Sequence, residues 1–155
     1  MCDDGIFPKE DDVKKMAKEV GFVHSYVEST TNKLHVQGFV EDVSVHRLCD
    51  WEFHLEFFPG NRRFLVSTES WVREEFRHRG IGHKMMDLKK KIVLHPSMVG
   101  CIDNLPWFRN VPPPAVIATV RHGNLPEIAL LQTCGWKNIS ETLEYQIYIL
   151  KTERT

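Results

Sequence analysis

The sequence of 155 residues has no long apolar run and no excess of charge of one sign. No stretch approaches the roughly 20 apolar residues of a membrane-spanning helix, so we expect no membrane partner. The first residues, MCDDGIFPKE, lack the basic and apolar regions of a secretory signal. The formal net charge of −1 gives no general attraction to polyanions, which makes nucleic acid a poor candidate ligand.

Closely spaced cysteine pairs are also missing. Cys2, Cys49, Cys101 and Cys134 are scattered along the chain and form no C-x-x-C motif. This spacing argues against a zinc site and against a disulfide framework, and we expect no metal. Scattered cysteines are typical of a protein in a reducing cytosol, so the sequence predicts a cytoplasmic location.

The remaining composition is that of an ordinary globular protein, with 42% hydrophobic and 26% charged residues. A chain of this length can bury a sizeable core within one domain. Because no internal repeat, low-complexity segment or linker interrupts it, we expect residues 1–155 to form a single domain.

Helix and strand periodicities alternate along the first half of the chain. Helical spacing of apolar residues, with acidic residues early and lysines late, predicts a helix over residues 8–21. Strict alternation in WEFHLEFF predicts a half-buried strand at 51–58, with Trp51, Phe53, Leu55 and Phe57 on its apolar face. Further strands are predicted at 24–29, 33–42 and 62–72, with a hairpin turn at 59–61.

In the second half, helical spacing returns at Ile81, Met85, Leu88 and Ile92, with lysines interleaved. Residues 94–114 are predicted as a long, proline-rich loop. A buried strand is then predicted at 115–120, a helix at 124–136 with Asn124 and Glu127 as a capping box, and a last strand at 143–150. This order predicts a mixed α/β (α+β) fold.

The segment EEFRHRGIGHKMM, residues 74–86, joins a strand to a helix through two glycines. N–H groups at a helix N-terminus lack partners within the helix, and glycines allow an anion to approach them closely. Arg77, Arg79, His83 and Lys84 can add positive charge, so the segment predicts an anion cradle of the phosphate-binding type. A capped turn with solvated arginines explains the same residues equally well.

Two other phosphate-binding motifs are excluded. A dinucleotide fingerprint requires a third glycine where Met85 stands. A P-loop requires a lysine after the second glycine, and that residue is His83.

The wider run SWVREEFRHRGIGHKMM resembles the signature of the GNAT superfamily of acyl-CoA-dependent N-acyltransferases. In that signature an apolar strand residue and an aromatic residue precede R-x-x-G-x-G, and here these places are filled by Val72, Phe76, Arg77, Gly80 and Gly82. The later run VIATVRHGNLPEIALLQTCGW is similar to the family's fifth strand, its asparagine and the helix that follows. The resemblance covers residues 63–136.

The resemblance implies a mostly antiparallel, twisted sheet with helices on both faces, splayed between the fourth and fifth strands. It also implies acetyl-CoA as cosubstrate, lying in the gap. The backbone of Trp71 and Val72 would hold the pantetheine arm, and Asn124 would face it. The residues that would hold the pyrophosphate or add charge around it are Arg77, His78, Arg79, Gly80, Ile81, Gly82, His83 and Lys84.

Acyl transfer to an amine needs a base for the amine, a donor for the carbonyl oxygen and a proton for the leaving thiolate. By resemblance, the N–H of Val72 polarises the carbonyl, and Glu69 is our candidate base. A solvent-facing strand residue is the competing interpretation of Glu69, and His54 is a reserve candidate. Many family members place a tyrosine acid where this chain has Leu131. With Cys134 interpreted as packing, the thiolate takes its proton from water.

We therefore predict an N-acetyltransferase that moves an acetyl group from acetyl-CoA to a primary amine of a small molecule or peptide, by direct attack in a ternary complex. Trp107 and Phe108 would wall the acceptor site or cap the core. One alternative is a CoA-binding module with little catalysis, which Leu131 favours. Another is a toxin-like enzyme acting on aminoacyl-tRNA, which the basic 77–91 segment favours and the net charge of −1 opposes. A homodimer is left open.

Overall fold

The computed structural model describes residues 5–39, 49–58, 62–72, 80–98, 101 and 116–150, and the side chains of residues 39, 57, 58, 62–64 and 69 fall outside this description. The described helices are α1 (Glu10–Glu19), α2 (Ile81–Val93) and α3 (Leu125–Thr133). The described strands are β1 (His24–Ser29), β2 (Lys33–Phe39), β3 (Cys49–Phe58), β4 (Arg62–Val72), β5 (Val116–Arg121), β6 (Lys137–Glu141) and β7 (Tyr145–Leu150).

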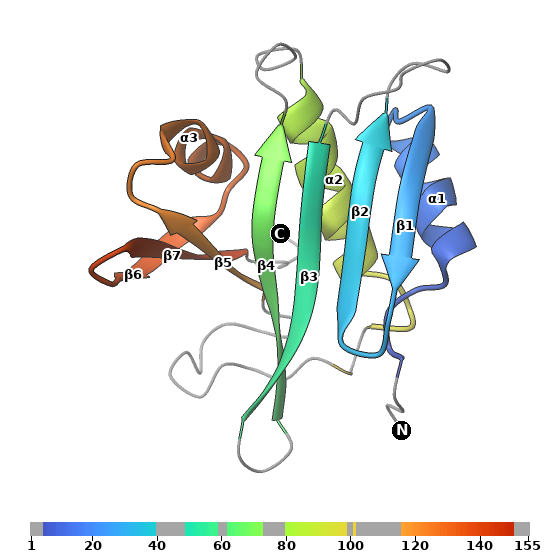
Figure 1. Ribbon diagram of the computed structural model, residues 1–155, viewed down its shortest axis with the longest axis horizontal. Coiled ribbons are helices and arrows are strands. Elements are labelled where there is room, and N and C mark those ends of the chain that lie inside the picture. The colour runs from blue at the N-terminus through green and yellow to red at the C-terminus, as the bar shows by residue number, and fades with distance from the viewer. Residues whose placement is uncertain are drawn as a thin grey trace.

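These strands form one sheet in the order β1-β2-β3-β4-β5-β7-β6 (Figure 1). Neighbouring strands are antiparallel, except that β4 and β5 run parallel. A parallel pair needs a crossover connection, and the chain between β4 and β5 contains α2. The mixed, mostly antiparallel sheet predicted from the sequence is confirmed.

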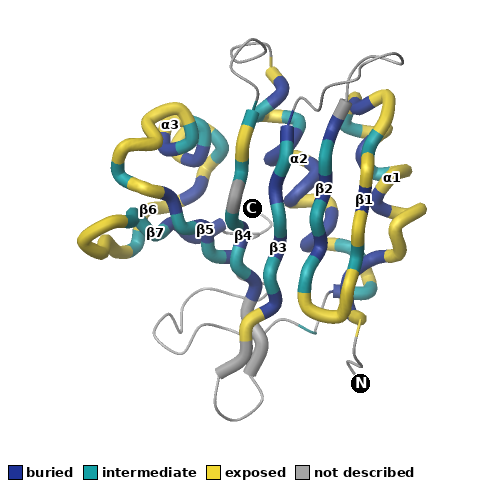
Figure 2. The backbone as a smooth tube through the Cα atoms, in the orientation of Figure 1, coloured by how far each residue is buried: buried dark blue, intermediate teal, exposed yellow. Residues whose placement is uncertain are grey.

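The core of the β1–β4 half lies between these strands and helices α1 and α2, which cover one face and pack against each other (Figure 1). The alternation predicted for β3 is confirmed where side chains are described. Trp51, Phe53 and Leu55 are buried, whereas Glu52 and His54 on the other face are half-buried. Figure 2 shows buried and intermediate segments alternating along β3. Burying side chains of this size contributes about 1.5–3 kcal/mol each, so β3 is a central element of the core.

The edge strand β6 was not predicted. Its sequence, KNISE, has no alternating apolar residues, and its side chains are exposed apart from half-buried Ile139. A polar sequence of this kind is common at a sheet edge, where charged side chains discourage pairing with other molecules. β6 pairs with β7 in an antiparallel hairpin, so the C-terminal part of the chain supplies two strands instead of the one expected.

The expectation for the cysteines is wrong at Cys101, which is disulfide-bonded. Cys49 and Cys134 are free. Separation along the chain does not limit which cysteines meet in space, so scattered positions were a poor guide to oxidation state. Because disulfides persist mainly in oxidising compartments, the argument for a cytoplasmic location loses its basis. Within the described residues, no helix has the length and apolar character to cross a membrane.

A bulge interrupts β4 near its C-terminal end. The β3–β4 register shifts between Asp50 and Glu52, so that Trp51 alone faces two β4 residues, Glu69 and Ser70. One extra residue reverses the alternation of the side chains that follow it. Ser70, the second residue of the bulge, therefore points to the face that α2 covers, where it meets Lys89, whereas strict alternation would have placed it on the opposite face.

The sheet opens between β4 and β5. The two strands are paired at three described positions, from Leu65 with Val116 to Ser67 with Ala118. β4 then continues to Val72 and β5 to Arg121, and Figure 1 shows the strands diverging. The splay predicted between the fourth and fifth strands is confirmed.

Candidate active site

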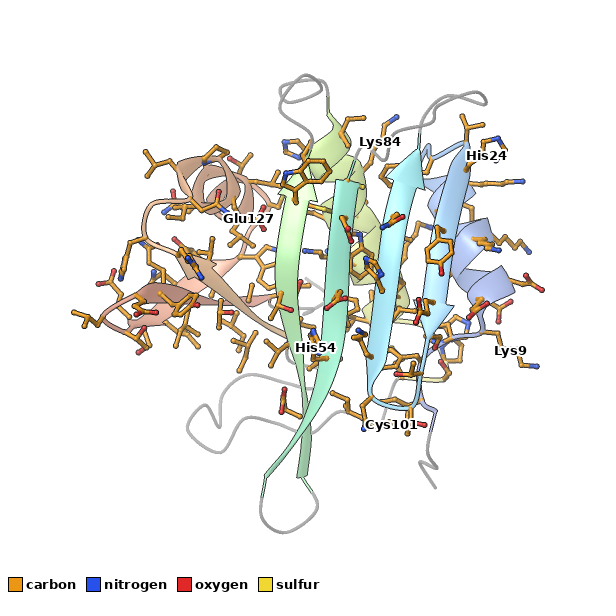
Figure 3. The ribbon with its side chains drawn as sticks, viewed as in Figure 1. Lys9, His24, His54, Lys84, Cys101 and Glu127 are labelled. Atoms are coloured by element: carbon orange, nitrogen blue, oxygen red, sulfur yellow. The ribbon has the colours of Figure 1, made fainter. Side chains whose placement is uncertain are left out.

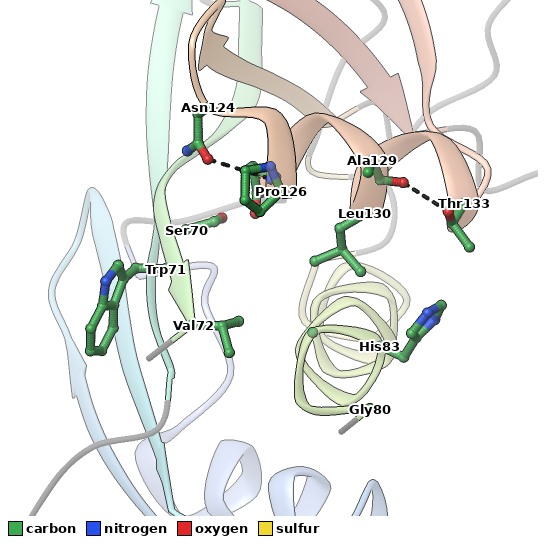
Figure 4. Close-up of a pocket in the computed structure, with 12 residues that line it drawn as sticks. Ser70, Trp71, Val72, Gly80, His83, Asn124, Pro126, Ala129, Leu130 and Thr133 are labelled. Atoms are coloured by element: carbon green, nitrogen blue, oxygen red, sulfur yellow. Dashed lines mark hydrogen bonds between the residues drawn. The ribbon is translucent and has the colours of Figure 1, made fainter. Parts of the chain in front are cut away.

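The splay leads into a cleft with a volume of about 260 Å³. It lies between the end of β4, the N-terminus of α2 and the helix α3 (Figure 4). A volume near the lower end of small-molecule sites is consistent with a narrow, extended ligand. The residues that line the cleft are Ser70, Trp71, Val72, Gly80, Gly82, His83, Asn124, Pro126, Glu127, Ala129, Leu130 and Thr133.

The N-terminus of α2 has the properties of an anion site. Gly80 is its N-cap, with a left-handed φ of 80°, and no side chain among the described residues caps the helix there. The first turn contains no acidic residue, and a Cβ at Gly80 would meet nothing within 4 Å. The helix dipole and the N–H groups of the first turn favour negative charge at this end of the cleft, and the described residues around Gly80 leave room for it, so the site fits a pyrophosphate.

A glycine is needed at position 82 for a different structural reason. A Cβ at this position would lie 2.8 Å from Cδ2 of Leu130, so the glycine allows α2 and α3 to pack closely. Leu130 itself lines the cleft on the α3 side. A substitution at Gly82 would disturb helix packing and ligand binding together, whereas Gly80 tests binding more cleanly.

Gly80→Asp is expected to weaken CoA binding at least tenfold relative to Gly80→Asn. Both side chains have nearly the same shape, and both residues tolerate a left-handed backbone better than other non-glycine residues. Only aspartate adds a negative charge beside the expected pyrophosphate, and tenfold corresponds to about 1.4 kcal/mol. Isothermal titration with CoA measures the difference. Equal affinities for the two variants would place the pyrophosphate elsewhere.

The cleft brings together part of the residue set predicted from the sequence. Trp71, Val72, Gly80, Gly82, His83 and Asn124 line it. The side chain of Ile81 is instead buried in the core. The ammonium group of Lys84 lies over Gly21, 2.8 Å from where a Cβ of that glycine would be, and Lys84 does not line the cleft. The residues Arg77, His78, Arg79, Trp107 and Phe108 lie outside the described part of the chain.

The structure describes the side chain of only one of the two candidate bases. The backbone of Glu69 lies in the β4 bulge, but its side chain is outside the description, so its role stays a prediction. The reserve candidate, His54, is placed along β3, and its Nε2 atom lies 2.9 Å from Oε2 of Glu52 (Figure 3). Since His54 does not line the cleft, the described geometry gives it no path to a ligand there.

A buried lysine behind the cleft was missed in the sequence. Lys89 is fully buried, and its Nζ atom donates a hydrogen bond of 2.5 Å to Oγ of Ser70. Nζ also lies 5.5 Å from the ring centroid of Trp51. Burial lowers the pKa of Lys89 to about 8, and the nearby Glu127 opposes this shift. A sequence signal existed, because Lys89 follows Met85 by four residues on the apolar stripe of α2.

Glu127 also has a different role from the one expected. Asn124 caps α3 as predicted, with its Oδ1 atom accepting from the Glu127 N–H at 3.4 Å (Figure 4). The reciprocal half of the capping box is absent, because the Asn124 N–H donates to the carbonyl of Arg121. The half-buried Glu127 side chain lines the cleft instead. Burial raises the pKa of its carboxyl, and Lys89 and a hydrogen bond from Ser70 offset part of the rise.

The residue at the position where the resemblance predicts a tyrosine acid is Leu131, which has no proton to donate. Leu131 is fully buried in the core, as its apolar side chain requires. Cys134 is half-buried, with its Sγ atom 3.4 Å from Nδ1 of His83, and burial raises the pKa of its thiol. The described residues contain no group of three or more side chains arranged to hold a metal ion.

A sheet that opens between a fourth and a parallel fifth strand, with a glycine-rich helix N-terminus beside the gap, is the fold of the GNAT superfamily of acetyltransferases. Comparison with solved structures supports this assignment of the fold. No family model matches the sequence, and no curated protein matches it.

Three solved structures illustrate the likeness. Arabidopsis thaliana NAA60, in complex with a bisubstrate analogue, has 12% identity and a TM-score of 0.54, with 90% of each chain covered. Campylobacter jejuni N-acetyltransferase PseH, in complex with acetyl coenzyme A, has 13% identity and a TM-score of 0.53, over 79% of this chain and 70% of that one. An acetyltransferase from Thermus thermophilus has 13% identity and a TM-score of 0.53. That match covers 77% of this chain and 64% of the Thermus chain, which is less than two thirds of its length.

Proposed function

We propose that this protein transfers an acetyl group from acetyl-CoA to a primary amine of a small molecule or peptide, by direct attack in a ternary complex. The observation behind the proposal is the cleft that begins where β4 and β5 diverge and ends at the N-terminus of α2, where the N-cap is Gly80. An extended arm can lie along a strand in such a gap while its phosphates meet the helix N-terminus. Structural neighbours in complexes with acetyl coenzyme A and with a bisubstrate analogue support the proposal.

Acetyl-CoA supplies the acetyl group in activated form, as a thioester. In the proposed reaction, Gly80 and the first turn of α2 bind the phosphates, and the backbone of Trp71 and Val72 orients the arm. The N–H of Val72 donates to the carbonyl oxygen on which negative charge develops. Glu69 takes the proton of the amine, directly or through water. Holding both reactants in the cleft removes the entropy cost of their encounter from the chemical step.

Acetyl-CoA is expected to raise the thermal stability of the protein. A ligand that binds only the folded state adds about 2.7 kcal/mol at 100 times its dissociation constant. Thermal unfolding with and without acetyl-CoA measures the shift, and Gly80→Asp serves as the control in which the shift should largely vanish. No shift at millimolar acetyl-CoA would contradict the proposed function.

A CoA-binding module with little catalysis is the second candidate, and the burial of Leu131 at the acid position favours it. Both candidates predict that acetyl-CoA binds, so binding alone does not separate them. A panel of amines and peptides, followed by the release of free thiol from acetyl-CoA, does separate them. Release that depends on one class of acceptor identifies an enzyme and its substrate class, and no release with bound acetyl-CoA identifies a binding module.

A further inference from the structure

A buried ammonium group stands directly behind the wall of the cleft. Lys89 is fully buried, and its Nζ atom donates a 2.5 Å hydrogen bond to Oγ of Ser70. Ser70 in turn lines the cleft, and the β4 bulge is what turns its side chain toward α2. A lysine in such a place is unfavourable, because a buried charge loses its hydration. An apolar side chain of similar length would fill the same space, so packing alone does not explain Lys89.

The hydrogen bonds in this cluster have a defined direction. An ammonium group has donors only, so Oγ of Ser70 accepts from Lys89 and keeps its own O–H to donate. A hydrogen bond from Ser70 to Glu127 holds back the rise in the pKa of that carboxyl. Figure 4 shows the Ser70 hydroxyl turned from β4 toward the start of α3. A chain of donors therefore runs from Lys89 through Ser70 to the cleft.

We propose that Ser70 and Lys89 form a proton relay that delivers a proton to the thiolate leaving acetyl-CoA. Ser70 is the catalytic residue, because its hydroxyl faces the cleft, and Lys89 is a positioning residue that acts through Ser70. The relay takes the place of the acid that is missing at Leu131. This inference rests on the proposed acetyl transfer.

The proton and electron balance of the step is complete. When the carbon–sulfur bond breaks, the Ser70 O–H turns from the Glu127 carboxylate to the sulfur. Sulfur keeps the electron pair of the broken bond and takes the proton of that hydroxyl. Oγ of Ser70 takes a proton from Lys89, which becomes a neutral amine. The attacking amine loses one proton to the base, so one proton leaves nitrogen and one reaches sulfur. Glu127, at the edge of the same cleft, passes a proton from solvent back through Ser70 to Lys89.

Among the described titratable groups near Lys89, Glu127 alone is expected to carry a negative charge at neutral pH. Glu127 from α3, Cys49 from β3 and Cys134 after α3 act on it. Burial raises the pKa of Cys49 to about 12 and also raises the pKa of Cys134, so both thiols stay protonated at neutral pH. A donor with a pKa of about 8 is well matched to a leaving thiol whose pKa is about 8.5.

The relay can be tested without knowing the acceptor, by titrating the thiol of CoA bound to the protein. The ultraviolet absorbance of the thiolate is followed against pH, and the same titration with desulfo-CoA subtracts the protein's own cysteines. Lys89→Met and Ser70→Ala should each raise the pKa of the bound thiol by about one unit, a tenfold change in its ionisation constant. Glu127→Gln should lower it, because a negative charge near the sulfur is removed.

Opposite shifts for the lysine and the glutamate are a result that a purely structural role would not produce. Lys90→Met, which changes an exposed lysine of the same helix, is the control and should leave the thiol pKa unchanged. If CoA binds but its thiol titrates alike in wild type, Lys89→Met and Ser70→Ala, the relay is overturned and the proposed function stands. If CoA does not bind the wild type at all, the proposed function is overturned and the relay falls with it.

Discussion

Glu69→Gln is expected to lower the rate of acetyl transfer at neutral pH by about 10²–10⁴-fold, the usual contribution of a general base. Glutamine keeps the shape of the side chain and removes its ability to accept a proton. The backbone of Glu69 lies in the β4 bulge, next to Ser70 and three residues before Val72, and both of these residues line the cleft. The rate is measured by thiol release from acetyl-CoA with an accepted amine.

The pH dependence distinguishes a base from a structural residue. The loss in Glu69→Gln should shrink at high pH, where more of the amine is already neutral. Glu56→Gln makes the same chemical change at an exposed position of β3 and should leave the rate unchanged. A full rate in Glu69→Gln would remove Glu69 from the mechanism and support the interpretation of a solvent-facing strand residue.

Lys89→Met is expected to stabilise the protein at pH 7 by up to about 3 kcal/mol, while it impairs the proposed relay. The estimate comes from the pKa of Lys89, which burial lowers from 10.5 to about 8, at 1.36 kcal/mol per unit. Methionine has a similar length and carries no charge to desolvate, and replacing buried charges by apolar groups is often stabilising. Urea denaturation at pH 7 measures the difference, with Lys90→Met as an exposed control.

The sign of the pH effect follows from proton binding. Between pH 8 and 10.5 the unfolded chain holds a proton on Lys89 that the folded protein has released, so wild-type stability should rise with pH across this window. Lys89→Met should lack that rise, and the two proteins should converge in stability above it. A variant that is less stable than wild type at pH 7 would show that the hydrogen bond to Ser70 outweighs the cost of burying the charge.

The fold was predictable where the sequence is periodic. The alternation in β3 followed from apolar spacing, because that strand has one face against the core. The bounds of β1 and β4 followed from the turn-like segments that precede or follow them. The splay between β4 and β5 followed from family resemblance alone, since no local pattern encodes it. β6 was missed for the opposite reason: an exposed edge strand buries almost nothing, so no hydrophobic pattern marks it.

The site was predictable only in its backbone part. Glycines at a strand–helix junction indicated the anion cradle, and Asn124 and its neighbours indicated the cap of α3. The cluster of Ser70, Lys89 and Glu127 was hidden for three separate reasons. The bulge turns the side chain of Ser70 to the opposite face of the sheet from the one that alternation predicts. Lys89 lies among other lysines of α2, so its burial could not be recognised from the sequence. The capping-box pattern already explained the presence of Glu127 at its position.

Because β4 and β5 pair over a short length, the two parts of the sheet that they connect are expected to separate more easily than the strands within each part. Among the described residues, three residue pairs between β4 and β5 join the β1–β4 part of the sheet to the part formed by β5, β7 and β6. Farther along, the close approach of Gly82 to Leu130 connects α2 and α3. Local opening between two such parts costs less than global unfolding. A ligand in the cleft contacts β4 and α2 on one side and α3 on the other, so it connects the two parts of the molecule and opposes their separation. Ligand binding in the cleft should therefore raise the free energy of local opening in the C-terminal part of the sheet, and slower amide hydrogen exchange in β5 and α3 would report that the ligand is bound.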